Sequence, residues 1–393
     1  MPTETTYITY ATRTPVGKFM GGLSTVPAPR LGALLVKDAL LSSKIPADLV
    51  DEVIMGQVLT AGCGQAPARQ TAIYGDLPPS VRATTINRVC GSGIKSVMMA
   101  DQAIRLGDAG CILAGGQENM SLAPHLMMNS RSGYRFGKAE LKDHMQFDGL
   151  WDPYGDVPMG QCAELCAKEF QFTRDEQDAF ALQSYERAKQ AWESKAFANE
   201  VISVEVPGRK GSILVDKDEE PFSVDLSRLS GLRPAFDKSG TVTAGNASSI
   251  NDGAALLMLA SESVMQKHNL KPLAKIVAQG SHARQPEWFT TAPIGCIEVL
   301  LEKSGLKSTD IDLWEINEAF AAVTMAAIKE LKLNPEQVNI HGGAVALGHP
   351  IGASGARVLV TLIHALKQKN LKRGLATLCI GGGEASGVII EMI

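Results

Sequence analysis

The amino-acid sequence predicts an α/β protein made of two similar halves with an insertion between them. Stretches typical of strands alternate with stretches typical of helices in the first part of the chain, which indicates parallel α/β layers. The last third of the chain repeats this order and three of its short motifs. We therefore predict an N-terminal half of residues 1–120, completed by 251–271, an inserted segment of 121–250, and a C-terminal half of 272–393.

The composition is that of a globular protein. The 393 residues are 45% hydrophobic and 20% charged, which excludes a largely disordered chain. With a net charge of −4 and no long run of lysine and arginine, we expect no nucleic acid partner. The first residues lack the basic and apolar regions of an export signal, and no apolar stretch reaches membrane-spanning length, so we expect no membrane association. Seven scattered cysteines argue against a disulfide framework and fit a reducing cytoplasm.

The N-terminal half shows the strand and helix patterns in alternation. β-Branched runs favour strands, and apolar residues at helical spacing favour helices. The elements expected from these patterns are a strand over Thr6–Tyr10, a helix over Leu31–Leu41, a strand over Val50–Gly56, a helix over Ala66–Tyr74, a strand over Val81–Val89, a helix that starts after Gly93, and a short buried strand that starts at Cys111 and ends at Gly115 and Gly116.

One cysteine, Cys90, lies where a strand is predicted to turn into a helix. Gly91 and Gly93 allow a tight turn, so N–H groups of the first helical turn could point at its sulfur. A thiol in that place is stabilised as the thiolate, which is the nucleophilic form. The alternative is that Cys90 is a small buried hydrophobic residue.

The inserted segment is rich in methionine and turns until a strongly helical stretch, Gln161–Lys195. Its methionines could be the adaptable lining of a binding site or the filling of a small irregular core, and the sequence leaves both open. Cys162 and Cys166 share one helix face and could be half of a metal site. No second pair with ligand spacing accompanies them, so a half-buried apolar face is favoured.

The C-terminal half repeats the first half in outline. Ile351–Val358 resembles Cys90–Val97, and each opens an apolar helix. If the two halves face each other, these two helix-opening loops meet in the middle of the molecule. The expected elements are a buried strand or helix over Ala254–Leu259, strands over Ala274–Gln279, Asp310–Ile316 and Leu375–Ile380, and a helix that opens with Ile351–Val358.

Three further residues in this half are candidates for chemistry. His349 is fixed between Gly348 and Pro350 and could act as a general base or donate to an oxyanion. The role of His341, in the same glycine-rich loop, stays undecided. Cys379 precedes a triple glycine whose N–H groups could bind an anion, although a lone cysteine is more commonly core filler. Asn317 could hold a water or a substrate carbonyl, or could simply cap the next helix.

Together these stretches resemble the thiolase family, over nearly the whole chain and in the expected order. The motifs that carry the resemblance are Asn87–Gly93, Asn317–Phe320, Gly342–Gly355 and Cys379–Gly383. The Cys-Gly-Ser-Gly form at Cys90 resembles the biosynthetic acetoacetyl-CoA branch of the family. The resemblance implies a five-layered αβαβα fold of two similar halves, with the inserted loop domain binding coenzyme A and forming tetramer contacts.

The resemblance also implies a ping-pong acyl transfer in which Cys90 is acylated and His349 takes its proton. The acyl oxygen would lie between the N–H groups of Cys90 and Gly381. Cys379 would remove an α-proton from a second acetyl-CoA, and His349 with a water held by Asn317 would stabilise the enolate. The coenzyme A contacts that the resemblance implies are Met159, Leu232, Phe236, Ala244, Ser248, Ala319 and Phe320.

The implied function is acetyl-CoA C-acetyltransferase, with acetyl-CoA, acetoacetyl-CoA and coenzyme A as substrates and products and no permanently bound cofactor. Pro221 and Phe222 stand where some relatives hold the cofactor or a potassium ion, so we predict no metal. The same resemblance implies a homotetramer. A degradative 3-ketoacyl-CoA thiolase of broader chain length is the alternative enzyme. A non-catalytic acyl-CoA-binding or lipid-carrier scaffold is the alternative from another class.

Overall fold

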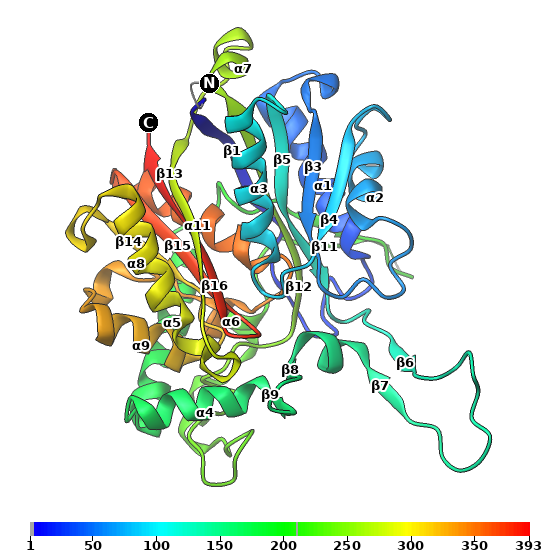
Figure 1. Cartoon of the computed structure of the whole chain (residues 1–393), viewed down its shortest axis with the longest axis vertical. Coiled ribbons are helices and arrows are strands. Elements are labelled where there is room, and N and C mark those ends of the chain that lie inside the picture. The colour runs from blue at the N-terminus through cyan, green and yellow to red at the C-terminus, as the bar shows by residue number, and fades with distance from the viewer. Residues whose placement is uncertain (1–3, 210) are drawn as a thin grey trace.

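The computed structural model describes residues 4–209 and 211–393. Residues 1–3 and Lys210 lie outside the described residues. Residues 1–3 are the start of the predicted N-terminal half and of the segment expected to lack an export signal. The chain folds into one large mixed sheet with helices on both sides of each half (Figure 1). Among the described residues, none of the helices combines the length and the apolarity that crossing a membrane requires.

Two strand sets with the same topology make up this sheet. The N-terminal set runs in the order β4 (Arg82–Ile86), β3 (Glu52–Gly56), β5 (Cys111–Asn119), β12 (Asn251–Ser261) and β1 (Thr6–Arg13). The C-terminal set runs in the order β14 (Leu313–Ile316), β15 (Arg373–Ile380), β16 (Glu384–Met392) and β13 (Ala274–Ala283). In both sets parallel strands are followed by two antiparallel strands, and the N-terminal set has one more parallel strand, β4. The predicted repeat is therefore confirmed. The sets join where Tyr7 and Ile8 of β1 pair with β13.

Helices complete five layers. On the outer face of the N-terminal strands lie α1 (Ala28–Ser43) and α2 (Pro67–Tyr74), and on that of the C-terminal strands lie α8 (Ala292–Ser304) and, beside it, α9 (Ala321–Leu331). Between the two strand sets lie α3 (Ser92–Leu106) and α11 (Ser354–Lys369), which pack on each other. Residues 354–366 of α11 are all buried, as a helix surrounded by protein must be. The predicted αβαβα fold is therefore confirmed.

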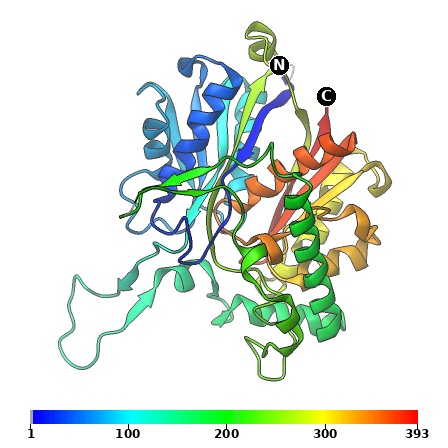
Figure 2. The same cartoon turned by 180° about the vertical axis from the view of Figure 1, so that it is seen from behind.

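The inserted segment between β5 and β12 wraps one end of this core (Figure 2). Its hairpin of β6 (His125–Met127) and β7 (Leu141–Asp143) extends away from the body in both views. The other elements of the segment are β8 (Trp151–Asp152), β9 (Val157–Pro158), α4 (Met159–Glu169), α5 (Arg174–Glu193), β10 (Val204–Val206), β11 (Ile213–Val215) and α6 (Glu220–Ser223). Short elements elsewhere are β2 (Gly17–Lys18), α7 (Glu262–Lys267) and α10 (Ala344–Leu347).

Two predicted elements differ from the structure. The helical stretch 161–195 is two helices, α4 and α5, because Thr173 and Glu176 form a capping box that starts a new helix. The strand β5 does not end at Gly115 and Gly116 but runs on to Asn119. These glycines serve close packing instead, since a Cβ on Gly116 would lie 2.0 Å from Gly352 O. The stretch 254–259, left open between strand and helix, belongs to the strand β12.

Candidate active site

A strained turn carries Cys90 at the start of α3. Val89 has a φ of 45°, a rare value for a β-branched residue, which its surroundings must enforce. Ser92 Oγ accepts a hydrogen bond from Arg88 N (2.8 Å) and donates to Val89 O (2.7 Å). The Arg88 guanidinium forms a salt bridge with Glu384 of β16 (3.0 Å). The turn that presents the thiol is therefore fastened to both halves.

The thiol of Cys90 is not a ready thiolate. Burial raises its pKa to about 12, although the backbone N–H groups of Gly381 and of Cys90 itself lower it, and the nearby carboxylate of Glu118 raises it further. The expectation that the helix start alone would stabilise the thiolate is therefore wrong. Loss of solvation outweighs the N–H donors, although Cys90 is only half-buried. Cys90 needs a base to remove its proton.

The imidazole of His349 is buried, and Ser354 sets its tautomer. Nδ1 of His349 lies 2.6 Å from Ser354 Oγ, and this hydroxyl donates its proton to Pro350 O (2.9 Å). We therefore assign the ring proton to Nδ1, which leaves the lone pair on Nε2. Within the described residues, Nε2 has no hydrogen-bond partner. Burial, and then the charge of Arg357, lower the pKa of His349 to about 3, so the ring is neutral and able to accept a proton.

The loop that carries His349 is fixed to the N-terminal half. His349 N donates to Asn251 Oδ1 (2.9 Å), and Asn251 Nδ2 donates to Gly17 O (3.0 Å). Gly348 has a φ of 101°, and a Cβ there would lie 2.3 Å from Asn251 Cγ. Only glycine fits at this position. The predicted rigidity of the turn thus comes from contacts across the molecule as well as from its glycine and proline.

Asn317 follows β14 and faces the imidazole. Its backbone N donates to Thr377 O of β15 (3.0 Å), and its Nδ2 lies 3.5 Å from His349 Nδ1. The alternative interpretation, a cap for the next helix, is wrong because Phe320 holds the N-cap position of α9. The amide of Asn317 is thus available to the site.

Cys379 and Gly381 come to the same place from the end of β15. The N–H of Gly381 is near enough to the thiol of Cys90 to lower its pKa, and a Cβ on Gly381 would lie 3.7 Å from Val89 Cγ1. Cys379 is close enough to Cys90 for the two thiols to influence each other. Burial, and then the neighbouring Cys90, raise the pKa of Cys379 well above its usual value. Gly383 has a φ of 88°, and a Cβ on it would lie 2.3 Å from Arg284 O, so the loop requires glycine.

An apolar cluster with several aromatic rings surrounds Cys379. Phe236 meets Phe320 edge-on at 6.1 Å between ring centroids, and Phe320 meets Phe289 at 6.3 Å. Met159 Cε lies 3.4 Å from the position of a Cβ on Gly381. Of the predicted coenzyme A contacts, the cluster contains Met159, Phe236, Ala319 and Phe320.

The other predicted coenzyme A contacts are Leu232, Ala244 and Ser248. Ser248 donates from both its N (3.0 Å) and its Oγ (2.9 Å) to Ala319 O. Leu232 packs against Gly245, the residue that follows the exposed Ala244. By contrast, His341 packs edge-on against Phe197 in another cluster, so its ring is part of the core.

Sequence reasoning missed three residues of the site: Ser354, Asn251 and Glu118. Ser354 stands in the glycine-rich run after His349, which was a usable signal. Glu118 accepts hydrogen bonds from Val58 N (2.9 Å), Leu59 N (3.1 Å) and Gly352 N (2.9 Å), and burial raises its pKa to about 7. It fastens the loop after His349 to the N-terminal half. Across residues 4–209 and 211–393, no cluster of three or more His, Cys, Asp or Glu could hold a metal.

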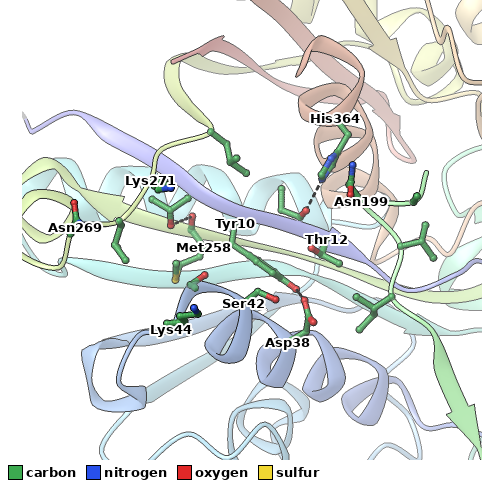
Figure 3. A pocket seen from close by; sticks show the side chains of 18 residues that line it. Tyr10, Thr12, Asp38, Ser42, Lys44, Asn199, Met258, Asn269, Lys271 and His364 are labelled. Atoms are coloured by element: carbon green, nitrogen blue, oxygen red, sulfur yellow. Dashed lines mark hydrogen bonds between the residues drawn. The ribbon is translucent and has the colours of Figure 1, made fainter. Parts of the chain in front are cut away.

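A hollow of about 640 Å³ lies away from these residues, between α1, β1 and α11 (Figure 3). Its polar groups mostly bond to the protein: Tyr10 Oη donates to Asp38 Oδ2 (2.6 Å), and His364 Nε2 lies 2.9 Å from Ala11 O. None of the predicted site residues lines it. The hollow is therefore separate from the candidate active site.

Family models match almost the whole chain. The model described as "Thiolase, N-terminal domain" matches residues 6–263, and "Thiolase, C-terminal domain" matches residues 270–392. The chain belongs to the thiolase family. Membership confirms the expected fold and the expectation that the chain is an acyltransferase of this family.

Several thiolases are similar over their full length. "Acetyl-CoA acetyltransferase 2" of Arabidopsis thaliana is 50% identical over 97% of this chain and 95% of its own. The acetyl-CoA acetyltransferase of Cupriavidus necator is 48% identical over 98% of each chain. A thiolase structure from Ascaris suum in complex with coenzyme A has a TM-score of 0.94, 44% identity, and coverage of 99% of this chain and 100% of its own. The acetyl-CoA acetyltransferase structure of Bacillus anthracis has a TM-score of 0.97 at 39% identity, with full coverage of both chains.

Proposed function

We propose that this thiolase is an acetyl-CoA C-acetyltransferase, which condenses two acetyl-CoA to acetoacetyl-CoA and coenzyme A and catalyses the reverse thiolysis. One observation carries the proposal: Cys90 of one half lies so near the other half that Gly381 lowers its pKa and that it raises the pKa of Cys379. A Cβ on Gly91 would lie 2.3 Å from Cδ1 of Ile380, the residue between Cys379 and Gly381 in the chain. The names of the similar proteins point to the same activity.

In the first half-reaction, Nε2 of His349 takes the proton of Cys90 while the sulfur attacks the thioester carbon. We assign the stabilisation of the acyl oxygen to the N–H groups of Gly381 and Cys90, which are near enough to the sulfur to lower its pKa. A preorganised donor of this kind contributes about 3 to 4 kcal/mol to the transition state. Coenzyme A leaves as a thiolate and takes the proton of Cys379, which becomes a thiolate, so acetyl-Cys90 and a protonated His349 remain.

In the second half-reaction, Cys379 as its thiolate removes an α-proton from the second acetyl-CoA. Acetylation of Cys90 helps, because the neighbouring thiol is one of the causes that raise the pKa of Cys379. Asn317 and His349 face the place where the enolate oxygen would lie. The carbanion attacks acetyl-Cys90, the Cys90 thiolate leaves, and the proton held by His349 returns to it, while Cys379 keeps the α-proton and is again a thiol.

Two substitutions test the division of labour between the cysteines. We expect Cys90→Ser to abolish acetyl-enzyme formation, because the less nucleophilic hydroxyl replaces the attacking sulfur. Cys379→Ser should still be acetylated by acetoacetyl-CoA but should condense poorly. Rapid mixing with radiolabelled acetyl-CoA, followed by tryptic mapping, measures both steps. An unlabelled Cys90 in the wild-type enzyme would refute the mechanism.

A degradative thiolase of broader chain length is the second candidate. Phe289, Phe320 and Phe236 belong to the same apolar cluster as Cys379, and we propose that their rings restrict the acyl group to a short one. Thiolysis of 3-ketoacyl-CoA of increasing length decides between the two. Equal efficiency on four and on ten carbons would reject the short-chain assignment. A non-catalytic scaffold is disfavoured because the thiols, the base and the N–H donors are all in place.

We also propose a homotetramer in the cytoplasm. β4 is the edge strand of the sheet and, within the described residues, its outer edge has no strand neighbour, which makes it a template for pairing. The β6–β7 hairpin carries exposed Met127 and Leu141 away from the body, and its tip exposes Phe136.

The proposed compartment rests on the cysteines. All seven cysteines are free, which suits a reducing compartment. Light scattering measures the oligomer, and cell fractionation tests the compartment.

A further inference from the structure

We propose that Arg357 is a positioning residue for the condensation step, because it holds the Asn317 amide with its nitrogen toward the reaction centre. Arg357 lies in the first turn of α11, and no more than 2% of the residue is exposed. It is too enclosed to meet a substrate and would position Asn317. Its charge also lowers the pKa of His349, an effect that the Arg357→Lys variant keeps. The inference rests on the proposed function and adds a residue to it.

Hydrogen-bond chemistry fixes the direction of the amide. Nη2 of Arg357 lies 3.4 Å from Asn317 Oδ1. A guanidinium has donors and no acceptor, so only the oxygen of the amide can face it. The nitrogen must then point to the other side, where it lies 3.5 Å from His349 Nδ1. Without Arg357, the protonated Nδ1 of His349 would favour the amide oxygen on its own side, so the guanidinium decides the orientation.

The remaining contacts of Arg357 are sparse, which makes Asn317 its main hydrogen-bond partner. Nη1 lies 3.6 Å from Glu315 Oε2, and within the described residues neither Nε nor Nη1 has a hydrogen-bond partner. The other fully buried arginine, Arg13, is different, because Glu200 (2.6 Å) and Asp218 (2.7 Å) hold it closely. An arginine kept only for stability would be expected to have partners of that kind.

The test is a double-mutant cycle between Arg357→Met and Asn317→Ala, made in a Glu315→Gln background. The background removes the carboxylate that loss of Arg357 would leave unpaired, and Glu315→Gln alone is the matched control. Burst formation of radiolabelled acetyl-Cys90 reports the first half-reaction, and steady-state condensation of acetyl-CoA reports the second.

We expect Arg357→Met to lower kcat for condensation about ten- to a hundred-fold, which is the range for loss of a hydrogen bond to a charged group. The KM for acetyl-CoA and the acetylation burst should stay within about two-fold of the control. In the presence of Asn317→Ala it should cause no further loss. Additive losses, or equal losses in both half-reactions, would overturn the inference. If Arg357→Met does not fold, Arg357→Lys is used in its place. Its kcat should lie between that of the control and the value expected for Arg357→Met, and it too should cause no further loss in the presence of Asn317→Ala. A wild-type enzyme that forms no acetyl-Cys90 would instead refute the proposed function.

Discussion

At the scale of single residues, the nucleophile and the base of the site are both uncharged before a substrate binds. Burial raises the pKa of Cys90 to about 12 and lowers that of His349 to about 3, so both groups are neutral at rest. Proton transfer from Cys90 to His349 is unfavourable until the sulfur begins to form a bond with a substrate carbonyl carbon. Neutrality protects the thiol from adventitious reaction and ties its activation to substrate binding.

The raised pKa predicts slow alkylation of Cys90 in the substrate-free enzyme. A thiol with a pKa of about 8.5 is about 3% thiolate at pH 7, whereas one with a pKa of about 12 is only about 0.001% thiolate. Because the thiolate is the reactive form, the rate with iodoacetamide should rise about ten-fold per pH unit from pH 7 to 10. Mass spectrometry of the Cys90 peptide measures this rate. A plateau by pH 8 would show that the thiol ionises much more easily.

Ser354→Ala should slow both half-reactions about ten- to a hundred-fold. The substitution removes the acceptor of the Nδ1 proton, so the imidazole loses the contact that sets its tautomer and orientation. Acetylation bursts and steady-state condensation measure the two losses. Ser96→Ala is the control, since Ser96 is a buried serine of α3 that donates only to the backbone oxygens of Gly93 and Gly115. Equal rates for the two variants would contradict the role of Ser354.

At the scale of elements, the start of α4 and the apolar cluster beside it form one wall of the site. Met159 begins this helix and reaches toward Gly381, and the ring of Phe236 lies flat against Gly160. A Cβ on Gly160 would lie 2.2 Å from Phe236 Cδ2. The glycine is therefore required for the ring to reach Phe320.

Gly160→Ala should displace Phe236 and weaken binding of coenzyme A thioesters. Overpacking of a well-filled place costs about 1 to 3 kcal/mol, so we expect KM for acetyl-CoA to rise about ten-fold. Steady-state kinetics with acetyl-CoA give this value. The matched control is Gly231→Ala in the same inserted segment, because a Cβ on Gly231 meets nothing within 4 Å. An unchanged KM for Gly160→Ala would show that Phe236 does not contact the substrate.

At the scale of the whole molecule, the active site exists only where the two halves touch. The central helices α3 and α11 meet through glycines: a Cβ on Gly93 would lie 2.8 Å from Ala356 N, and one on Gly355 would lie 2.4 Å from Ile94 N. Each helix is opened by a loop of the site. The close approach of the helices therefore sets the distance between Cys90 on one side and His349 on the other.

Gly355→Ala should lower stability and activity together. The methyl group would meet the backbone of α3, which cannot move aside like a side chain, so we expect a loss of about 3 kcal/mol in the free energy of unfolding. Both half-reactions should slow, because Cys90 and His349 move apart. Urea unfolding and the acetylation burst measure the two effects. Lys367→Ala, an exposed position of the same helix, should change neither. A stable, fully active Gly355→Ala enzyme would mean that the helices are not in tight contact.

Much of the fold and of the candidate site could be predicted, because the patterns are local. The repeat of strand, loop and helix at Cys90 and at Ile351 predicted two facing halves, and glycines and proline marked the turns at His349 and Cys379. The end of β5 was predicted wrongly, because Gly115 and Gly116 signal a turn in sequence but serve a close approach in space. Asn251 and Glu118 were missed for a related reason, since they lie 98 and 234 positions from the residues of the His349 loop that they bind. Ser354, only five positions from His349, could have been found.

The sequence by itself determined the αβαβα class, the family and the identity of the groups that can react, since each depends on residue types at short spacing. Only the tertiary structure decided their protonation state. Burial sets the pKa values of Cys90, His349 and Cys379, and burial is a property of what packs around a group rather than of its neighbours in the chain. The structure likewise decided which way the Asn317 amide faces, because a guanidinium from another element can accept nothing and must be met by oxygen.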